Sequence, residues 1–490
     1  MALLAACSRA PAPPVERIVF LPFENLTGDD SLNWIAAAAP TIAAGDLAGL
    51  RGILPLRTAT VSEGYFAQPA RFVHGYFTRA GARSDDRAIR FEIEIEDATR
   101  HKMIATDSEQ DDVLAAMNRA AKRIDSAAAP FSTANAEAVS AWGRGEFERA
   151  IELDPDFGAA WLAWAEKLQQ SGDGAKAMDV ASQALARPAL ASPIDRARIE
   201  LVVAAIRHDP DARVKALEDL ARSTPSDTGV LETLAQAEMN ARRFGDAAAH
   251  LRALSKLDPS NAGVINSLGY AEAFAGDLKA ARFAFETYGA QPGQKANSLD
   301  SLGEVYFIHG QFADAEKYFL AAHQANAAFL QGEDLWKAAC ARWLAGDGKG
   351  ADALMARYLE FRRKQHDLLT DWREASWLFS TGRSELAMNK LAGVPNRQLA
   401  ERQAALWRGS IELPHDLAAL KQRYENTPPS ADGQARVLYA AALVAAGNKD
   451  DARPLLELWP MPWSPGDALL ESWVLPKFME LRSAVGLAGK

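Results

Sequence analysis

The sequence predicts a mostly α-helical chain, in which a right-handed superhelix of helix pairs follows a small α/β domain with a mixed sheet. First, small residues recur at a constant step of 34 residues, from Ala235 to Gly269 to Gly303. Second, residues 17–125 lack this step and contain the alternation of apolar and charged residues that is typical of β-strands. Third, a chain of 490 residues exceeds a single hydrophobic core, so an elongated array or several domains are expected.

The first sixteen residues contain a possible lipidation signal followed by a Pro/Ala tether. The segment Leu4-Ala5-Ala6-Cys7 resembles a bacterial lipobox, the site at which a signal peptide is cut and the cysteine is acylated. On this resemblance Cys7 is the lipidation site, and Ser8 after it favours the outer membrane. The apolar stretch before Cys7 is short for a signal peptide, so this interpretation assumes a true start further upstream. The alternative is a terminal segment without a function.

Residues 17–125 are predicted to form the small α/β domain. Buried-strand runs, amphipathic helices and turn-forming loops alternate along this region. Pro40 is expected to kink or divide the first helix. The order β-α-β-α-β-β-α predicts a small mixed sheet with helices packed on it. The predicted elements are strands 17–23 and 52–56, helices 32–50 and 60–66, an antiparallel strand pair 71–81 and 88–106, and a helix 111–124.

The same region resembles a known domain. The segment "VFLPFENLTGDDSLNWIAAAAPTIAAGDLAGL" and the later "FVHGYFTRAGARSDDRAIRFEIEIEDA" are similar to the TolB amino-terminal domain, in the version found before repeat arrays in bacterial signalling proteins. In those relatives a kinase, cyclase or DNA-binding domain often comes first. The resemblance implies protein interaction or an accessory role, and it carries over no catalytic residue.

After a linker at 126–134, residues 135–490 are expected to form about eight helix pairs. The 34-residue step is also kept by Ala247, Ala281 and Ala315, and by a bulky set of Leu251, Phe285 and Phe319. A period of 34 with these marks is the tetratricopeptide signature, and the chain resembles that family. Small residues on the first helix of each pair allow close approach, and the bulky set fills the remaining space. The apolar stretch 469–487 is predicted to be a C-terminal capping helix.

Composition and motifs argue against several classes of function. A net charge of −10 without a clustered basic stripe disfavours nucleic-acid binding. No apolar run approaches the length of a membrane span. Beyond Cys7 there is a single cysteine, Cys340, which the helical spacing predicts to be a buried small hydrophobe. No metal-ligand spacing, calcium loop, nucleophile elbow or phosphate loop is present, so we expect no catalytic residue, no metal and no cofactor.

The first helices of the pairs are expected to line a concave groove that binds a partner protein or peptide. The groove-lining helices carry neither Lys nor Arg at their first inward positions, which disfavours capture of a terminal carboxylate. Its aromatic side chains are either anchors for the partner or rings packed internally, and helical spacing does not separate the two. A partner with apolar anchors and positive charge is expected. The predicted groove residues are Glu232, Gln236, Asn266, Tyr270, Phe274, Asp300, Glu304, Phe307, Trp336, Trp343, Trp372 and Phe379.

The leading functional hypothesis is therefore a non-enzymatic scaffold of the bacterial cell envelope. It would be lipid-anchored at Cys7 on the periplasmic face of the outer membrane, and could belong to a larger assembly. The alternative is a cytoplasmic accessory protein that lacks the effector domain of its signalling relatives. An enzyme that uses the groove or the small domain as a substrate site is the third hypothesis.

Overall fold

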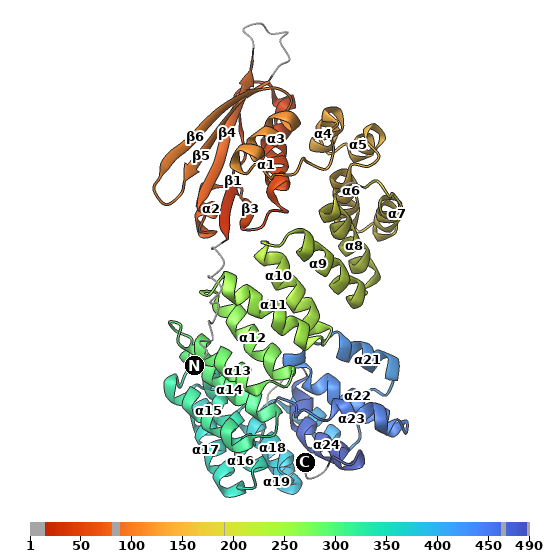
Figure 1. Cartoon of the computed structure of the whole chain (residues 1–490). Helices are drawn as coiled ribbons and strands as arrows, with labels where there is room; N and C mark the ends of the chain where they lie inside the picture. The colour runs from red at the N-terminus through yellow and green to blue at the C-terminus, as the bar shows by residue number, and fades with distance from the viewer. Residues whose placement is uncertain (1–14, 81–88, 191, 462–466, 488–490) are drawn as a thin grey trace, which may run out of the picture. The chain divides into compact units, whose positions relative to one another are not determined.

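The computed structural model describes residues 15–80, 89–190, 192–461 and 467–487. The chain divides into two compact units, Met1–Ala237 and Glu238–Lys490, and each is described by itself. The described residues form one mixed sheet followed by successive helix pairs (Figure 1), which confirms the predicted fold class.

The sheet has the order β3-β1-β4-β5-β6, with the short β2 also paired to β4. Strands β1, β3 and β4 run parallel, whereas β4, β5 and β6 form an antiparallel meander. The sheet is therefore mixed, as predicted. Its strands are β1 (Glu16–Phe20), β2 (Glu24–Asn25), β3 (Ile53–Arg57), β4 (Arg71–Arg79), β5 (Ile89–Asp97) and β6 (Lys102–Gln110).

The predicted strand 88–106 is instead two strands joined by a tight turn. The Asp97 carboxylate accepts hydrogen bonds from the backbone N–H groups of Thr99 (3.0 Å) and Arg100 (2.9 Å). This local bonding reverses the chain, and His101 completes the turn with a φ of 49°. The alternating pattern continues on both sides of the turn, which is why it resembled a single long strand.

Helices α1 (Trp34–Leu47) and α3 (Val113–Ile124) pack together on one face of the sheet, and α2 (Val61–Phe66) follows β3 (Figure 1). Helix α1 continues through Pro40 without division. It is rich in alanine, so it approaches the sheet closely and buries Ile35 and Ile42.

The sheet shares one hydrophobic core with the first repeat helices. Phe131, in the predicted linker, packs its ring against Trp142 and Phe157, at 5.7 and 5.9 Å between centroids. The core continues without a break from Ile18 to Val202. The linker therefore changes the secondary structure but does not separate two cores. The helices of this region are α4 (Ala136–Gly143), α5 (Phe147–Leu153), α6 (Gly158–Gln170), α7 (Gly174–Leu185), α8 (Pro193–Arg207) and α9 (Pro210–Ser223).

The repeat helices continue in pairs, so that α4 to α23 make ten pairs before a final helix α24 in the described part of the chain. Helix α10 (Thr228–Asn240) spans the division between the two units. The helices that follow are α11 (Phe244–Leu257), α12 (Ala262–Phe274), α13 (Leu278–Gly289), α14 (Lys295–Ile308), α15 (Phe312–Ala325), α16 (Glu333–Leu344), α17 (Gly348–Lys364), α18 (Thr370–Ser380), α19 (Ser384–Leu391), α20 (Arg397–Trp407), α21 (Leu417–Glu425), α22 (Gly433–Ala445), α23 (Lys449–Leu455) and α24 (Glu471–Ala484).

The recurring glycines leave room for the bulky residues of the same pair. A Cβ atom on Gly269 would lie 2.5 Å from the ring of Phe285, and one on Gly303 would lie 2.5 Å from the ring of Phe319. Both rings are fully buried. The structure thus confirms that these glycines serve helix packing, because no side chain larger than hydrogen fits without displacing the ring.

The final helix packs against the last helix pair and also reaches back to an earlier one. Helix α24 contacts α22 and also α18, and Ser380 of α18 donates a hydrogen bond to the backbone carbonyl of Ser472 (3.2 Å). Before it, the backbone N–H of Trp459 donates to the carbonyl of Ile308 (2.8 Å). The C-terminal segment therefore contacts earlier repeats in addition to the last helix pair.

Candidate functional site

The predicted groove residues fall into three classes of exposure. The side chains of Asp300, Phe307, Trp336 and Trp372 are buried, with exposed fractions of 4%, 0%, 7% and 2%. Only Glu232 and Gln236, both on α10, are exposed. The remaining six are half-buried, namely Asn266, Tyr270, Phe274, Glu304, Trp343 and Phe379.

Three predicted groove residues, Tyr270, Asp300 and Glu304, meet in a buried polar cluster between α12, α14 and α16. The Lys337 ammonium lies 2.6 Å from Asp300 Oδ1 and 2.7 Å from Glu304 Oε1. The Tyr270 hydroxyl donates to Glu304 Oε2 at 2.7 Å and contacts the Ser301 hydroxyl at 3.0 Å. Sequence analysis found the carboxylates and the tyrosine but missed Lys337, because a lysine within the apolar run of α16 gave no sign of its partners.

Burial and the crowding of carboxyl groups set the charges of this cluster. Burial and the Glu304 carboxylate raise the pKa of Asp300 to about 6, although Lys337 opposes the shift. Burial and the neighbouring Asp300 raise the pKa of Asp334 to about 9. Burial would lower the pKa of Lys337, but Glu304 and Asp300 together raise it. Lys337 is therefore charged at neutral pH, and Asp334 holds a proton.

The aromatic end of the predicted groove is filled by the chain itself, which corrects the assignment of its buried rings as partner anchors. The Trp372 indole N–H donates to Gln403 Oε1 at 3.1 Å, and the amide of Gln403 donates to the backbone carbonyl of Leu469 at 3.0 Å. Phe379 stacks on Trp407 with 4.5 Å between ring centroids. Helix α20 and the segment that begins α24 thus cover α18.

The other buried positions of this end also pack internally. The Trp336 ring meets Tyr358 edge-on at 5.6 Å, and Phe307 meets Phe312 at 5.4 Å. Trp343 packs half-buried against the same core. For Phe307, Trp336 and Trp372 the internal-packing alternative is the one that the structure supports. Position along a helix predicts which way a side chain points, but it does not reveal which later segment covers it.

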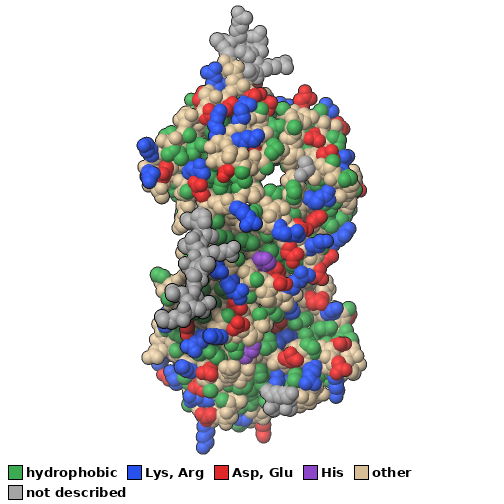
Figure 2. Space-filling model, viewed as in Figure 1, with side chains coloured by type: hydrophobic (Ala, Val, Ile, Leu, Met, Phe, Trp, Pro, Cys, Tyr) green, Lys and Arg blue, Asp and Glu red, His purple; other side chains and the backbone are tan. Residues whose placement is uncertain are grey.

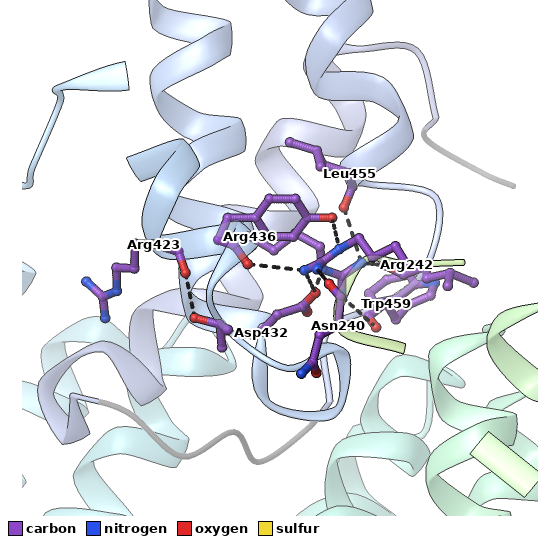
Figure 3. A network of polar contacts seen from close by, with 10 residues as sticks. Asn240, Arg242, Arg423, Asp432, Arg436, Leu455 and Trp459 are labelled. Atoms are coloured by element: carbon purple, nitrogen blue, oxygen red, sulfur yellow. Dashed lines mark hydrogen bonds and ion pairs between the residues drawn. The ribbon is translucent and has the colours of Figure 1, made fainter. Parts of the chain in front are cut away.

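One arginine ties the start of the second unit to its C-terminal repeats (Figure 3). Arg242 Nη2 donates to Asp432 Oδ2 at 2.9 Å, and its Nε donates to the Tyr424 hydroxyl at 2.7 Å. Its guanidinium carbon lies 4.0 Å from the centre of the Tyr424 ring. Arg242 occupies the turn position at which the next two repeats have Gly276 and Gly310, and it adopts the same left-handed conformation, with a φ of 58°.

A second candidate site is a cavity of about 960 Å³ within the first unit. It is lined by α1, β3, the segment before α4, and helices α6 and α8. Two buried aspartates, Asp46 and Asp195, line it, with exposed fractions of 2% and 7%. Arg57, Glu166 and Arg198 line it and are solvent-exposed, so the cavity opens to water where these three side chains lie.

Burial disfavours the charged form of several side chains that line the cavity. Burial raises the pKa of Asp46 to about 8, with Lys122 as the only opposing charge. Burial also raises the pKa of Asp195, against the Ser132 hydroxyl and the Arg198 charge. Burial and repulsion by Arg198 lower the pKa of Arg57. Sequence analysis missed this site, although one signal was present: Asp46 interrupts the otherwise apolar stretch of α1.

The remaining sequence-based expectations concern the two cysteines, metal binding, membrane spans and surface charge. Cys7 lies outside the described residues. Cys340 is buried, and burial raises the pKa of its thiol to about 12, which suits a packing role. Among the described residues no group of three or more His, Cys, Asp or Glu side chains is arranged to hold a metal ion. No helix within those ranges is both long enough and apolar enough to span a bilayer. Acidic and basic side chains are intermixed on the face shown in Figure 2.

Comparisons with known proteins give solved structures of low similarity. No protein-family model matches the chain. No curated protein matches it. The protein MamA is 19% identical, with a TM-score of 0.30 over 36% of this chain and 94% of MamA. A tetratricopeptide repeat protein from Parabacteroides merdae is 12% identical, with a TM-score of 0.32 over 59% of this chain and 99% of the other. PilF of Pseudomonas aeruginosa is 17% identical, with a TM-score of 0.28 over 46% and 96%. The fold assignment rests on the helix pairs and the 34-residue step of this chain itself.

Proposed function

We propose that the protein is a non-enzymatic scaffold that binds a segment of a partner protein on the inner positions of its repeat helices. The observation that carries the proposal is the row of half-buried groups on α12 and α14. There the Tyr270 hydroxyl bonds to Glu304 and to the Ser301 hydroxyl, and the Ser301 hydroxyl donates to Asn266 on α12. Such a row of fixed polar groups on packed helices is suited to recognising an extended or helical segment.

The charge of this row favours a partner segment that carries a cation. Because Asp334 holds a proton, the carboxylates of Asp300 and Glu304 face the single ammonium of Lys337, which leaves one negative charge over. Phe274 supplies a half-buried apolar surface at the end of α12 and stacks on Phe244 with 5.0 Å between ring centroids. On α10, the exposed Glu232 and Gln236 are proposed as partner contacts in their own right.

Site-specific photo-crosslinking tests which side of the helix pairs binds the partner. A benzophenone amino acid is placed at Phe274, and as a matched control at Phe283, which is 73% exposed on the second helix of the same pair. Irradiation of cells that produce the full chain is expected to give a discrete adduct from position 274 and none from position 283. Adducts from position 283 alone would reject the inner face as the partner site.

The proposal extends to the cell envelope, with Cys7 as an acylated anchor and a TolB-like domain before the repeats. Its support is the lipobox resemblance and the arrangement of a small mixed sheet before a repeat array. Labelling with a palmitate analogue in the native cells is expected to mark the wild-type protein but not Cys7→Ser. Equal absence of label in both chains would favour the cytoplasmic accessory protein, the alternative that the same TolB resemblance supports.

A further inference from the structure

We propose that the cavity of the first unit is a binding site for an organic cation, an ammonium or guanidinium group held by the carboxylate of Asp46. The inference is independent of the partner groove, since none of the proposed groove residues lines the cavity. It rests on three observations: a buried carboxyl group without a partner, a space large enough for a ligand, and an opening to solvent.

The carboxyl group of Asp46 is the first observation. Its side chain is 2% exposed, and neither carboxylate oxygen has a hydrogen-bond partner among the described residues. Buried carboxylates are normally paired, because an unpaired one loses its hydration without compensation. Lys122 is near enough to act on Asp46 electrostatically but does not bond to it. The missing partner is therefore a donor that enters from the cavity.

The second aspartate strengthens the choice of a cation. Asp195 lines the same cavity from α8 and is 7% exposed. Gly158 makes room for it, since a Cβ at that position would lie 2.7 Å from the Asp195 carboxylate. Two buried carboxyl groups of separate elements thus border one space. A planar guanidinium or an ammonium offers several donors and the opposite charge, whereas a neutral ligand offers no compensation for the charge.

The size and the opening define the ligand further. A volume of about 960 Å³ is within the range of small-molecule sites and also admits one long side chain with its backbone. The exposed Arg57 and Arg198 line the same cavity, so a carboxylate or a peptide carbonyl near the opening would also be favoured. The cation can therefore belong to a free metabolite-sized amine or to a Lys or Arg side chain of a partner.

Binding is measured by ligand-observed NMR on the full chain with n-butylguanidinium, and with neutral n-butylurea as its isosteric control. We expect saturable binding of the cation and none of the urea. Asp46→Asn is expected to weaken the binding of n-butylguanidinium at least tenfold. Asp30→Asn, an exposed carboxylate of the same unit outside the cavity lining, is the matched control and should leave binding unchanged.

A second arm separates the two sources of the cation. A Gly-Ser peptide with one central arginine is compared with the same peptide carrying neutral citrulline. Preference for the arginine peptide over butylguanidinium indicates a partner protein, and the reverse indicates a small molecule. Equal binding of charged and neutral probes, or no binding of either cation, overturns the proposal. If circular dichroism shows that Asp46→Asn is unfolded, Asp195→Asn with the same expected weakening takes its place.

The pH dependence gives an independent readout on the wild-type chain. Because the free cavity keeps Asp46 largely protonated at pH 7, binding of a cation must release a proton, and affinity should rise between pH 6 and pH 9. The other charged groups that line the cavity are Arg57, Glu166, Asp195, Arg198 and Asp227. An affinity that stays constant in the wild type over this range would contradict a role for Asp46.

Discussion

Two buried aspartates, Asp300 in the second unit and Asp46 in the first, have opposite surroundings. In the second unit Asp300 lies 2.6 Å from the Lys337 ammonium, and the chain supplies the cation for its own carboxylates. In the first unit Asp46 is as deeply buried, but none of the described residues donates a hydrogen bond to its carboxyl group, and a cavity adjoins it. The comparison teaches that burial of a charge alone does not identify a binding site. A charge with its partner in place supports the fold, whereas one that lacks a partner beside open space is available for a ligand.

The largest effect is expected in the cluster of the second unit, where the buried charges are paired. Lys337→Met removes the only cation of the cluster and leaves Asp300 and Glu304 facing each other in a buried environment. We expect a loss of about 3–5 kcal/mol in the free energy of unfolding of this region. The measurement is hydrogen exchange of peptides from α14 and α16 as a function of urea in the full chain. The triple variant Lys337→Met, Asp300→Asn, Glu304→Gln should recover much of the loss, and a single variant as stable as wild type would break the comparison.

A smaller effect is expected at Arg242, which pairs with a carboxylate that has a second partner. Asp432 keeps Arg436 at 3.1 Å when Arg242 is removed. Arg242→Ala should therefore cost about 2 kcal/mol, mainly through the lost charged hydrogen bonds. Faster hydrogen exchange of peptides from both α11 and α21 is the expected signal.

Arg242→Gly is the matched control, because it removes the same contacts but suits the left-handed backbone. It should be less destabilising than Arg242→Ala by about 1 kcal/mol. The two variants separate the contribution of the contacts from the cost of the φ of 58°. Equal stabilities of the two variants would show that the left-handed backbone at position 242 is not strained by a side chain.

The effect expected at the unpaired aspartate depends on pH and is smallest at low pH. The pKa of Asp46 is about 8 in the folded chain, above the ordinary aspartate value, so the folded state holds the proton more tightly than the unfolded state. Its contribution to stability is complete below about pH 4 and is lost as the pH rises towards 8. Asp46→Asn should therefore stabilise the chain relative to wild type, and by clearly more at pH 8 than at pH 5.

Hydrogen exchange of peptides from α1 measures this difference between pH 5 and pH 8, after correction for the intrinsic exchange rates. Destabilisation by Asp46→Asn at both pH values would mean that Asp46 has a structural partner, and the contrast between the two units would fail. Addition of n-butylguanidinium at pH 8 should stabilise the wild type and not the variant.

The sequence by itself determined the repeat architecture and the place of the small sheet. Gly269 packs against the ring of Phe285, and Gly303 packs against the ring of Phe319, each within its own helix pair. Such local packing follows from spacing along the chain. The mixed sheet was predictable for the same reason, since period-2 alternation reflects neighbouring residues. The short strand β2 was not predicted, and the turn after Asp97 was missed because the alternation is the same on both sides of it.

Tertiary structure alone decided what faces the inner positions and where a charge lacks a partner. Helix α24 and Gln403 cover Trp372, and Lys337 pairs with Asp300, through contacts between separate helices that no local period encodes. The cavity beside Asp46 arises likewise where α1, β3, α6 and α8 border a common space. Periodicity states which side of a helix is inward, but only the path of the whole chain determines whether that side meets protein, ligand or water.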